Sequence, residues 1–169
     1  PNESVISMHD VDTVYSVPIL LNKQKVDKTI IEKLKIKAKK PNLNDWKRVV
    51  KAKLMPEKEV NVSFVGKYTE LKDSYKSINE ALEHAGIKNK AKVNINFVEA
   101  ESITSKNIKK TLANTDAVLV PGGFGERGIE GMILACQFAR ENNIPYLGIC
   151  LGMQVAIIEY ARNVLNLKG

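Results

Sequence analysis

The sequence predicts an α/β protein built on a doubly wound, mostly parallel open sheet. From about Val60 onward, short apolar runs alternate with amphipathic stretches, a pattern typical of parallel strands joined by crossover helices. Two of these runs end in glycine-containing turns. Because sites in such sheets lie beyond the carboxyl ends of the strands, we expect the functional residues at these two turns.

The predicted strands and helices follow one another in four pairs. Strands are expected over residues 60–65, 93–98, 117–120 and 146–149. We expect a helix capped by Asp73 or Ser74 and ended by Gly86, a second helix beginning at Thr104, a third over residues 129–141 and a fourth over 151–165. This order predicts the doubly wound topology.

The first part of the chain has a different pattern. Residues 26–39 show helical spacing, but Pro41 and the segment 56–59 interrupt it. We interpret residues 1–40 as the tail of another domain, 41–59 as a linker and 60–169 as the α/β domain.

Charge and composition argue against a nucleic-acid-binding, membrane-spanning or secreted protein. Residues 23–58 hold thirteen Lys or Arg against four acidic residues, a local charge of +9 in a chain whose net charge is +7. Its basic residues are all Lys except for a single Arg, and Trp46 is its one aromatic residue. This lack of a stacking platform favours a solvated connector over a nucleic-acid surface. No run approaches the roughly 18 apolar residues that cross a bilayer, and no secretory signal is seen. The two cysteines, Cys136 and Cys150, are expected to be thiols, and we expect a cytoplasmic protein.

A nucleophile turn is predicted at residues 148–152, which read Gly-Ile-Cys-Leu-Gly between a strand and a helix. The turn is too tight for side chains at its two glycine positions. At the N-terminus of the helix, free N–H groups and the helix dipole favour a thiolate on Cys150. The alternative is a structural cysteine in a glycine-shaped loop, which is our expectation for Cys136 in mid-helix.

A thiolate that attacks an amide needs hydrogen-bond donors for the oxyanion that forms. The backbone N–H of Leu151 is one candidate. The second is expected from residues 121–125, which read Pro-Gly-Gly-Phe-Gly at the end of the preceding strand. Such a turn would equally suit a phosphate, but it lacks the Gly-Lys-Ser or Gly-Lys-Thr ending of a P-loop.

The two turns together resemble the paired motifs of class I glutamine amidotransferases. Longer runs are similar to one family among them, the CTP synthases: residues 7–12, 65–68, 75–77, 119–132 and 138–146. The resemblance implies a flavodoxin-like glutaminase domain over residues 60–169 and the C-terminal end of a synthetase (amidoligase) domain over 1–40. It covers essentially the whole chain.

The resemblance also implies an activity and its residues. CTP synthases, ligases of pyrimidine biosynthesis, use ATP with Mg²⁺ to aminate UTP with ammonia from glutamine; GTP activates them, CTP inhibits them, and a tetramer is expected. Cys150 would form a glutamyl thioester, with Gly123 and Leu151 as oxyanion donors. The implied glutamine-binding residues are Gly123, Leu151, Gly152, Met153 and Gln154, and the implied ATP-binding residues are His9, Asp10 and Val11. No metal ligand is expected in this segment.

The sequence departs from the family pattern in what it lacks. The His and Glu that complete the triad beyond the elbow, and the synthetase P-loop, do not occur in it. The only histidines are His9 and His84, which we expect to be surface or packed residues. We therefore expect a fragment that does not turn over glutamine by itself. Two alternatives stay open: another class I amidotransferase or related Cys hydrolase, and a non-catalytic assembly module.

Overall fold

The computed structural model describes residues 5–67 and 72–167. The chain divides into two compact units. One comprises Pro1–Lys58 with His84–Lys92, and the other comprises Glu59–Glu83 with Val93–Gly169. None of the helices within the described ranges is long and apolar enough to span a membrane.

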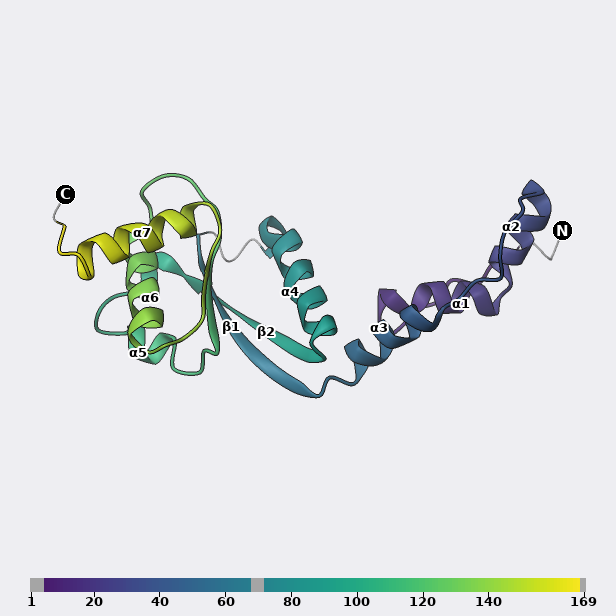
Figure 1. Ribbon diagram of the computed structural model, residues 1–169, viewed down its shortest axis with the longest axis horizontal. Coiled ribbons are helices and arrows are strands. Elements are labelled where there is room, and N and C mark those ends of the chain that lie inside the picture. Colours follow the sequence, from purple (N-terminus) through teal and green to yellow (C-terminus); the bar gives the residue numbers. More distant parts are fainter. Residues whose placement is uncertain (1–4, 68–71, 168–169) are drawn as a thin grey trace. The chain divides into compact units, whose positions relative to one another are not determined.

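The predicted sheet lies mainly in the second unit and has four strands (Figure 1). They are β1 (Lys58–Gly66), β2 (Ala91–Glu99), β3 (Ala117–Val120) and β4 (Tyr146–Gly148), in the order β2-β1-β3-β4. β3 pairs in parallel with β1 on one side and with β4 on the other. Because the chain runs from β1 out to β2 and then returns past β1 to β3, the topology switches direction between β1 and β3. The predicted fold class is confirmed.

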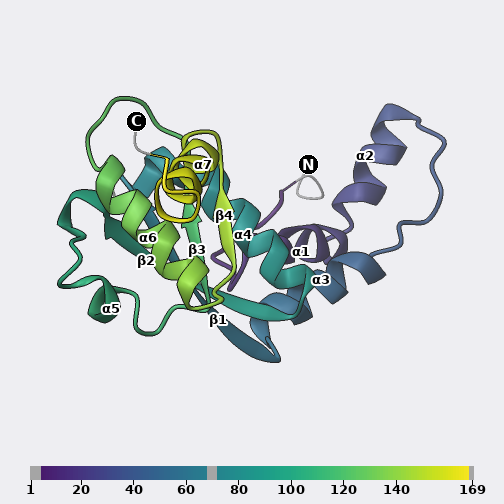
Figure 2. The ribbon, with the colours of Figure 1, turned by 60° about the vertical axis from the view of Figure 1, so that its left-hand side comes forward.

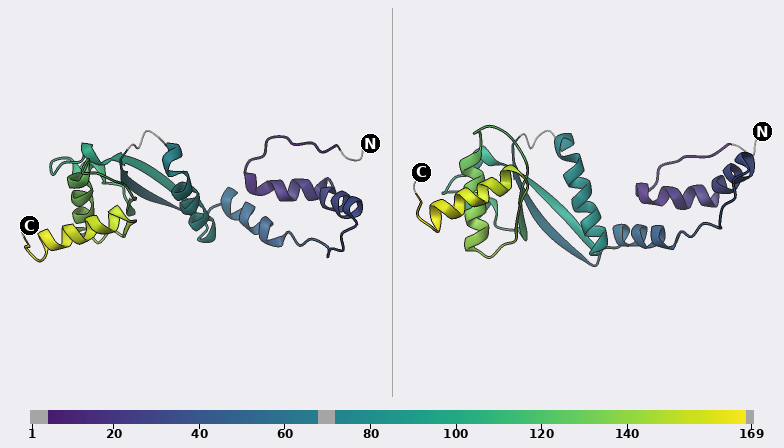
Figure 3. Two further views of the ribbon diagram at one scale, coloured as in Figure 1. Left: turned by 90° about the horizontal axis from the view of Figure 1, so that it is seen from above. Right: turned by 45° about the horizontal axis from the view of Figure 1, so that its top comes forward.

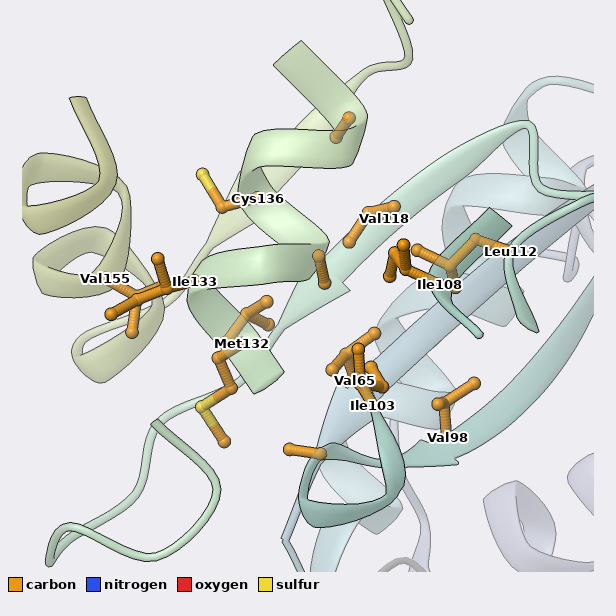
Figure 4. Packing of buried hydrophobic residues seen from close by; sticks show 14 residues of the cluster. Val65, Val98, Ile103, Ile108, Leu112, Val118, Met132, Ile133, Cys136 and Val155 are labelled. Atoms are coloured by element: carbon orange, nitrogen blue, oxygen red, sulfur yellow. The ribbon is translucent and has the colours of Figure 1, made fainter. Parts of the chain in front are cut away.

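Both faces of the sheet are buried along its two central strands, β1 and β3, whereas Leu147 of the edge strand β4 is exposed. On one face Phe64, which is fully buried, packs with Val62, Leu119 and side chains of α4 (Lys76–Lys88). On the other, Val65 and Val118 pack in a cluster with α5 (Ile108–Thr111), α6 (Ile129–Glu141) and α7 (Leu151–Asn163) (Figure 4). The alternation predicted in residues 60–65 therefore separates two cores, not core from solvent, and residues 62–66 are all buried.

Helices α6 and α7 lie side by side over β3 and β4 (Figure 2), and the green and yellow helices of Figure 3 show the same neighbours from two other directions. Gly131 allows α6 to approach the 3₁₀ turn η4 (Ala100–Ser102), because a Cβ built on Gly131 would lie 1.8 Å from the carbonyl oxygen of Ala100. The close approach seals the core beneath α6.

The first unit is mainly helical. Its elements are the 3₁₀ turn η2 (Val14–Ser16), α1 (Val17–Lys23), α2 (Val26–Leu34) and α3 (Asn44–Leu54). Thr13 caps η2, its hydroxyl oxygen accepting a hydrogen bond from the N–H of Tyr15. Helix α3 occupies part of the stretch expected to be a linker, and none of its residues is buried.

Three helix boundaries were predicted wrongly. A 3₁₀ turn, η3 (Lys72–Tyr75), precedes α4, which then passes through the buried Gly86 and ends at Lys88. The helix expected from Thr104 is reduced to the single turn α5, because the Asn107 side chain accepts from the N–H of Thr104 and donates to the carbonyl of Ser102. These local bonds hold a turn where the helix would have begun. Helix α7 ends two residues earlier than expected, at Asn163.

Candidate active site

Cys150 lies at the corner between β4 and α7, as the N-cap of the helix, and its side chain is exposed. Its backbone has φ 52° and ψ −100°, a conformation that L-residues rarely adopt. The carbonyl of Cys150 accepts hydrogen bonds from the N–H groups of Met153, at 3.1 Å, and Gln154, at 3.2 Å. The corner is thus a fixed part of the first helical turn, and it presents the sulfur outward.

Glycine is required on both sides of this corner. A Cβ built on Gly148 would lie 2.4 Å from the carbonyl oxygen of Gly152, and one built on Gly152 would lie 2.2 Å from the carbonyl oxygen of Val120. Neither backbone group can move without displacing the strand or the helix. The predicted tightness of the turn is confirmed, and it has a specific cause in the contact of α7 with β3 and β4.

The glycine turn after β3 lies directly beside the corner. A Cβ built on Gly122 would be 3.6 Å from the Cβ of Cys150, and one built on Gly123 would be 3.3 Å from Cδ2 of Leu151. Within residues 5–67 and 72–167, no acceptor is recorded for the backbone N–H of Gly123 or of Leu151. Two free amide donors on neighbouring segments therefore flank the exposed thiol, which is the arrangement that an oxyanion requires.

The other predicted site residues fall in two places. Met153 and Gln154 are exposed on the first turn of α7, while Gly152 is buried against β3. His9, Asp10 and Val11 belong to the first unit, where they precede its first helical turn in a segment without regular structure. Tyr68, part of one of the runs that carry the resemblance, falls outside the described residues.

Neither histidine belongs to the unit that carries Cys150. His9 is exposed, and the ring of His84 meets Tyr15 edge-on within the first unit, with ring centroids 6.0 Å apart. Among the described residues, no group of three or more His, Cys, Asp or Glu side chains is arranged to hold a metal ion.

The second cysteine has the opposite environment. Cys136 is buried in the core between α6 and its neighbours. Burial, and after it the negative charge of Glu159, raises the pKa of Cys136 to about 11. A buried thiol of this kind is inert, as expected for a core residue.

Three polar contacts that support the corner were not predicted. The hydroxyl of Tyr146, whose pKa is raised chiefly by burial, donates to the carbonyl of Gly152 at 2.8 Å. The ammonium of Lys67 donates to two carbonyls of the glycine turn. Arg140 and Glu159 join α6 to α7. Each contact links residues that the chain brings together only on folding, so no local pattern signals it.

Comparison with known proteins decides the family. Residues 70–169, more than half of the chain, match the family model for class-I glutamine amidotransferases. The chain belongs to this family. The matched region of the amidotransferase includes both the Cys150 corner and the glycine turn after β3.

Among solved structures, this class-I amidotransferase chain is similar to the glutaminase domain of CTPS from Trypanosoma brucei, described with bound acivicin. The two are 44% identical with a TM-score of 0.59, and the match covers 63% of this chain and 42% of that one. The chain therefore spans less than half the length of this relative.

Proposed function

We propose that this chain is part of a CTP synthase and that its second unit hydrolyses glutamine through a thioester on Cys150. The observation that carries the proposal is the exposed Cys150 thiol at a strained helix N-cap, beside two free backbone donors. The 44% identity to the glutaminase domain of a CTPS supports this family among the class-I amidotransferases.

In the proposed reaction, the Cys150 sulfur attacks the side-chain amide carbon of glutamine. The carbonyl oxygen becomes an oxyanion, which accepts hydrogen bonds from the N–H groups of Leu151 and Gly123. The carbon–nitrogen bond then breaks, ammonia leaves with a proton from a general acid, and a γ-glutamyl thioester remains. Water hydrolyses the thioester to glutamate and restores the thiol. Gly152, Met153 and Gln154, on the same helical turn, complete the proposed glutamine site with Gly123 and Leu151.

The proton transfers need a general acid and base. Both histidines of the chain, His9 and His84, belong to the unit that does not carry Cys150. In class I amidotransferases, as the resemblance implies, a His oriented by a Glu has this role. We place this pair in a part of the parent protein outside the 169 residues. The chain by itself is then expected not to turn over glutamine at an enzymatic rate.

The synthetase half of the proposal rests on the resemblance. ATP with Mg²⁺ would phosphorylate UTP, ammonia would displace the phosphate, GTP would activate and CTP would inhibit, in a cytoplasmic tetramer. His9, Asp10 and Val11 would contact the adenine of ATP. His9 stands where the family commonly has Lys, so the contact at this position would be made by the backbone or be altered.

The test uses the intact parent protein with UTP, ATP and Mg²⁺. The wild-type enzyme should form CTP with either glutamine or ammonia as the nitrogen source. Cys150→Ala should lose the glutamine-dependent reaction and keep the ammonia-dependent one, whereas Cys136→Ala, the matched control, should keep both. Glutamine hydrolysis without any UTP-dependent incorporation of ammonia would favour another class-I amidotransferase. Failure of both reactions in the wild type would favour a non-catalytic module.

A further inference from the structure

A single buried lysine fastens the glycine turn that flanks Cys150. Lys67 follows directly after β1 and is only 4% exposed. Its ammonium donates to the carbonyl of Phe124 at 2.8 Å and to the carbonyl of Gly125 at 2.6 Å. Both acceptors belong to the turn that carries Gly123, so the end of β1 is tied to the turn that follows β3.

The turn has little else to hold it. Within residues 5–67 and 72–167, no backbone–backbone hydrogen bond is recorded for residues 122–125. The side chain of Phe124 is 95% exposed, so it anchors nothing in the core. Gly125 has φ +76°, and a Cβ built there would find nothing within 4 Å. The orientation of this stretch therefore depends on the two hydrogen bonds from Lys67.

The lysine is itself held in place. The hydroxyl of Tyr75 donates to the carbonyl of Lys67, and the Tyr75 ring packs on Phe64 with centroids 4.6 Å apart. Burying an ammonium group is costly unless its donors are satisfied, and here two carbonyls of the glycine turn accept from it. An apolar side chain at this position would leave both carbonyls without this donor.

We propose that Lys67 is a positioning residue for the oxyanion site. Its two hydrogen bonds fix the peptides on either side of Gly125 and thereby restrict Gly123, two residues earlier, beside Leu151. The N–H of Gly123 is then already oriented when Cys150 attacks, instead of being ordered during the reaction. Lys67 acts through the turn and touches neither the thiol nor the substrate. This inference rests on the proposed glutaminase function.

The test measures glutamine hydrolysis by the intact parent enzyme carrying Lys67→Met. Complete loss of one oxyanion donor costs about 10²–10³ in kcat, so a donor that is present but misplaced should cost about 10- to 100-fold. The KM for glutamine should change by less than about threefold, because the substrate is bound mainly by other groups. Lys67→Gln, which can donate to one carbonyl, should have an intermediate kcat. Lys109→Met, on the exposed side of α5, is the matched control and should match the wild type.

Two further measurements separate positioning from a general structural role. Alkylation of Cys150 by iodoacetamide forms no oxyanion, so its rate should be unchanged in Lys67→Met, and so should ammonia-dependent CTP formation. Limited proteolysis should become faster within the glycine turn and stay unchanged in α7, because a loosened exposed loop is cleaved more readily. This proteolysis measurement is independent of activity.

The proposal is overturned if Lys67→Met keeps kcat within about twofold of the wild type. It is also overturned if kcat and the iodoacetamide rate fall together, or if proteolysis within the glycine turn is unchanged. If Lys67→Met does not fold, Lys67→Gln decides by the same criteria. A wild-type parent that does not hydrolyse glutamine would overturn the proposed function as well, whereas an active wild type with an equally active Lys67→Met would overturn only the role of Lys67.

Discussion

The guanidinium of Arg140 binds the carboxylate of Glu159 through two nitrogens, with Nη2 2.7 Å from Oε1 and Nε 3.0 Å from Oε2. Glu159 is only 1% exposed and also accepts from the side chain of Asn163. Burial alone would raise the pKa of Glu159, but the hydrogen bonds from Arg140 and Asn163 outweigh it and hold the pKa below its usual value. The pair joins α6 to α7, the helix that begins at Cys150.

Glu159→Gln should lower the free energy of unfolding by about 1.5–3 kcal/mol, since hydrogen bonds to charged groups contribute about this much when buried. The matched control is Glu130→Gln. Glu130 pairs with Arg162 across the same two helices, but its side chain is 75% exposed, so the cost should stay below about 1 kcal/mol. Urea denaturation of both variants measures the difference. Equal effects would show that burial of the Arg140–Glu159 pair is unimportant.

The contribution of Glu159 to the free energy of unfolding should decrease as the pH is lowered. Its pKa is lowered in the folded protein, so its stabilisation is fully present above the unfolded pKa of about 4.3. It is lost as the pH falls through the folded pKa, below that value. Unfolding free energies of wild type and Glu159→Gln should therefore differ by a constant amount near neutral pH and converge below about pH 4. A difference that grows on acidification would contradict the assignment.

The two cysteines should differ in reaction with iodoacetamide at pH 8. Cys136 is buried with a pKa of about 11, so only about one molecule in a thousand carries its thiolate at that pH. Cys150 is exposed and should be modified, while Cys136 stays unmodified until the protein unfolds. Peptide mapping by mass spectrometry after timed alkylation checks this. Comparable alkylation rates at Cys136 and Cys150 in the folded protein would contradict the burial of Cys136.

Gly152→Ala should disrupt the corner. The added Cβ would lie 2.2 Å from the carbonyl oxygen of Val120, and overpacking a rigid contact typically costs about 1–3 kcal/mol or more. The matched control is Gly125→Ala, which meets no atom within 4 Å and has only the strain of φ +76°, about 1–2 kcal/mol. Thermal denaturation compares stability, and iodoacetamide alkylation of Cys150 reports the corner. The rate of Cys150 alkylation should change in Gly152→Ala and stay unchanged in Gly125→Ala. The reverse result would contradict the close contact of Gly152 with Val120.

The sequence revealed the parts of this site that consecutive residues encode. The strand ends, the glycines at 148 and 152, and the helix after Cys150 were predictable because each depends on a local pattern of residue size and polarity. The helix expected from Thr104 failed because the Asn107 side chain competes for backbone groups that a helix would use.

What was missed depends on contacts between distant segments. Lys67 lies 57 residues before Phe124, and Arg140 lies 19 residues before Glu159. A lysine after a strand and an arginine near the end of a helix are both ordinary surface patterns, so only the folded structure shows that they are paired across elements. The burial of β1 on both faces was likewise hidden, because alternation alone does not reveal what covers each face of a sheet.

The most direct test of the account is labelling of the intact parent enzyme with a glutamine-like chloroketone, followed by peptide mapping. The account predicts one adduct per chain on Cys150, formed much faster than with a free thiol such as glutathione and slowed by added glutamine. No adduct on Cys150, or an adduct formed there no faster than with glutathione and without protection by glutamine, would contradict the assignment of Cys150 as the nucleophile.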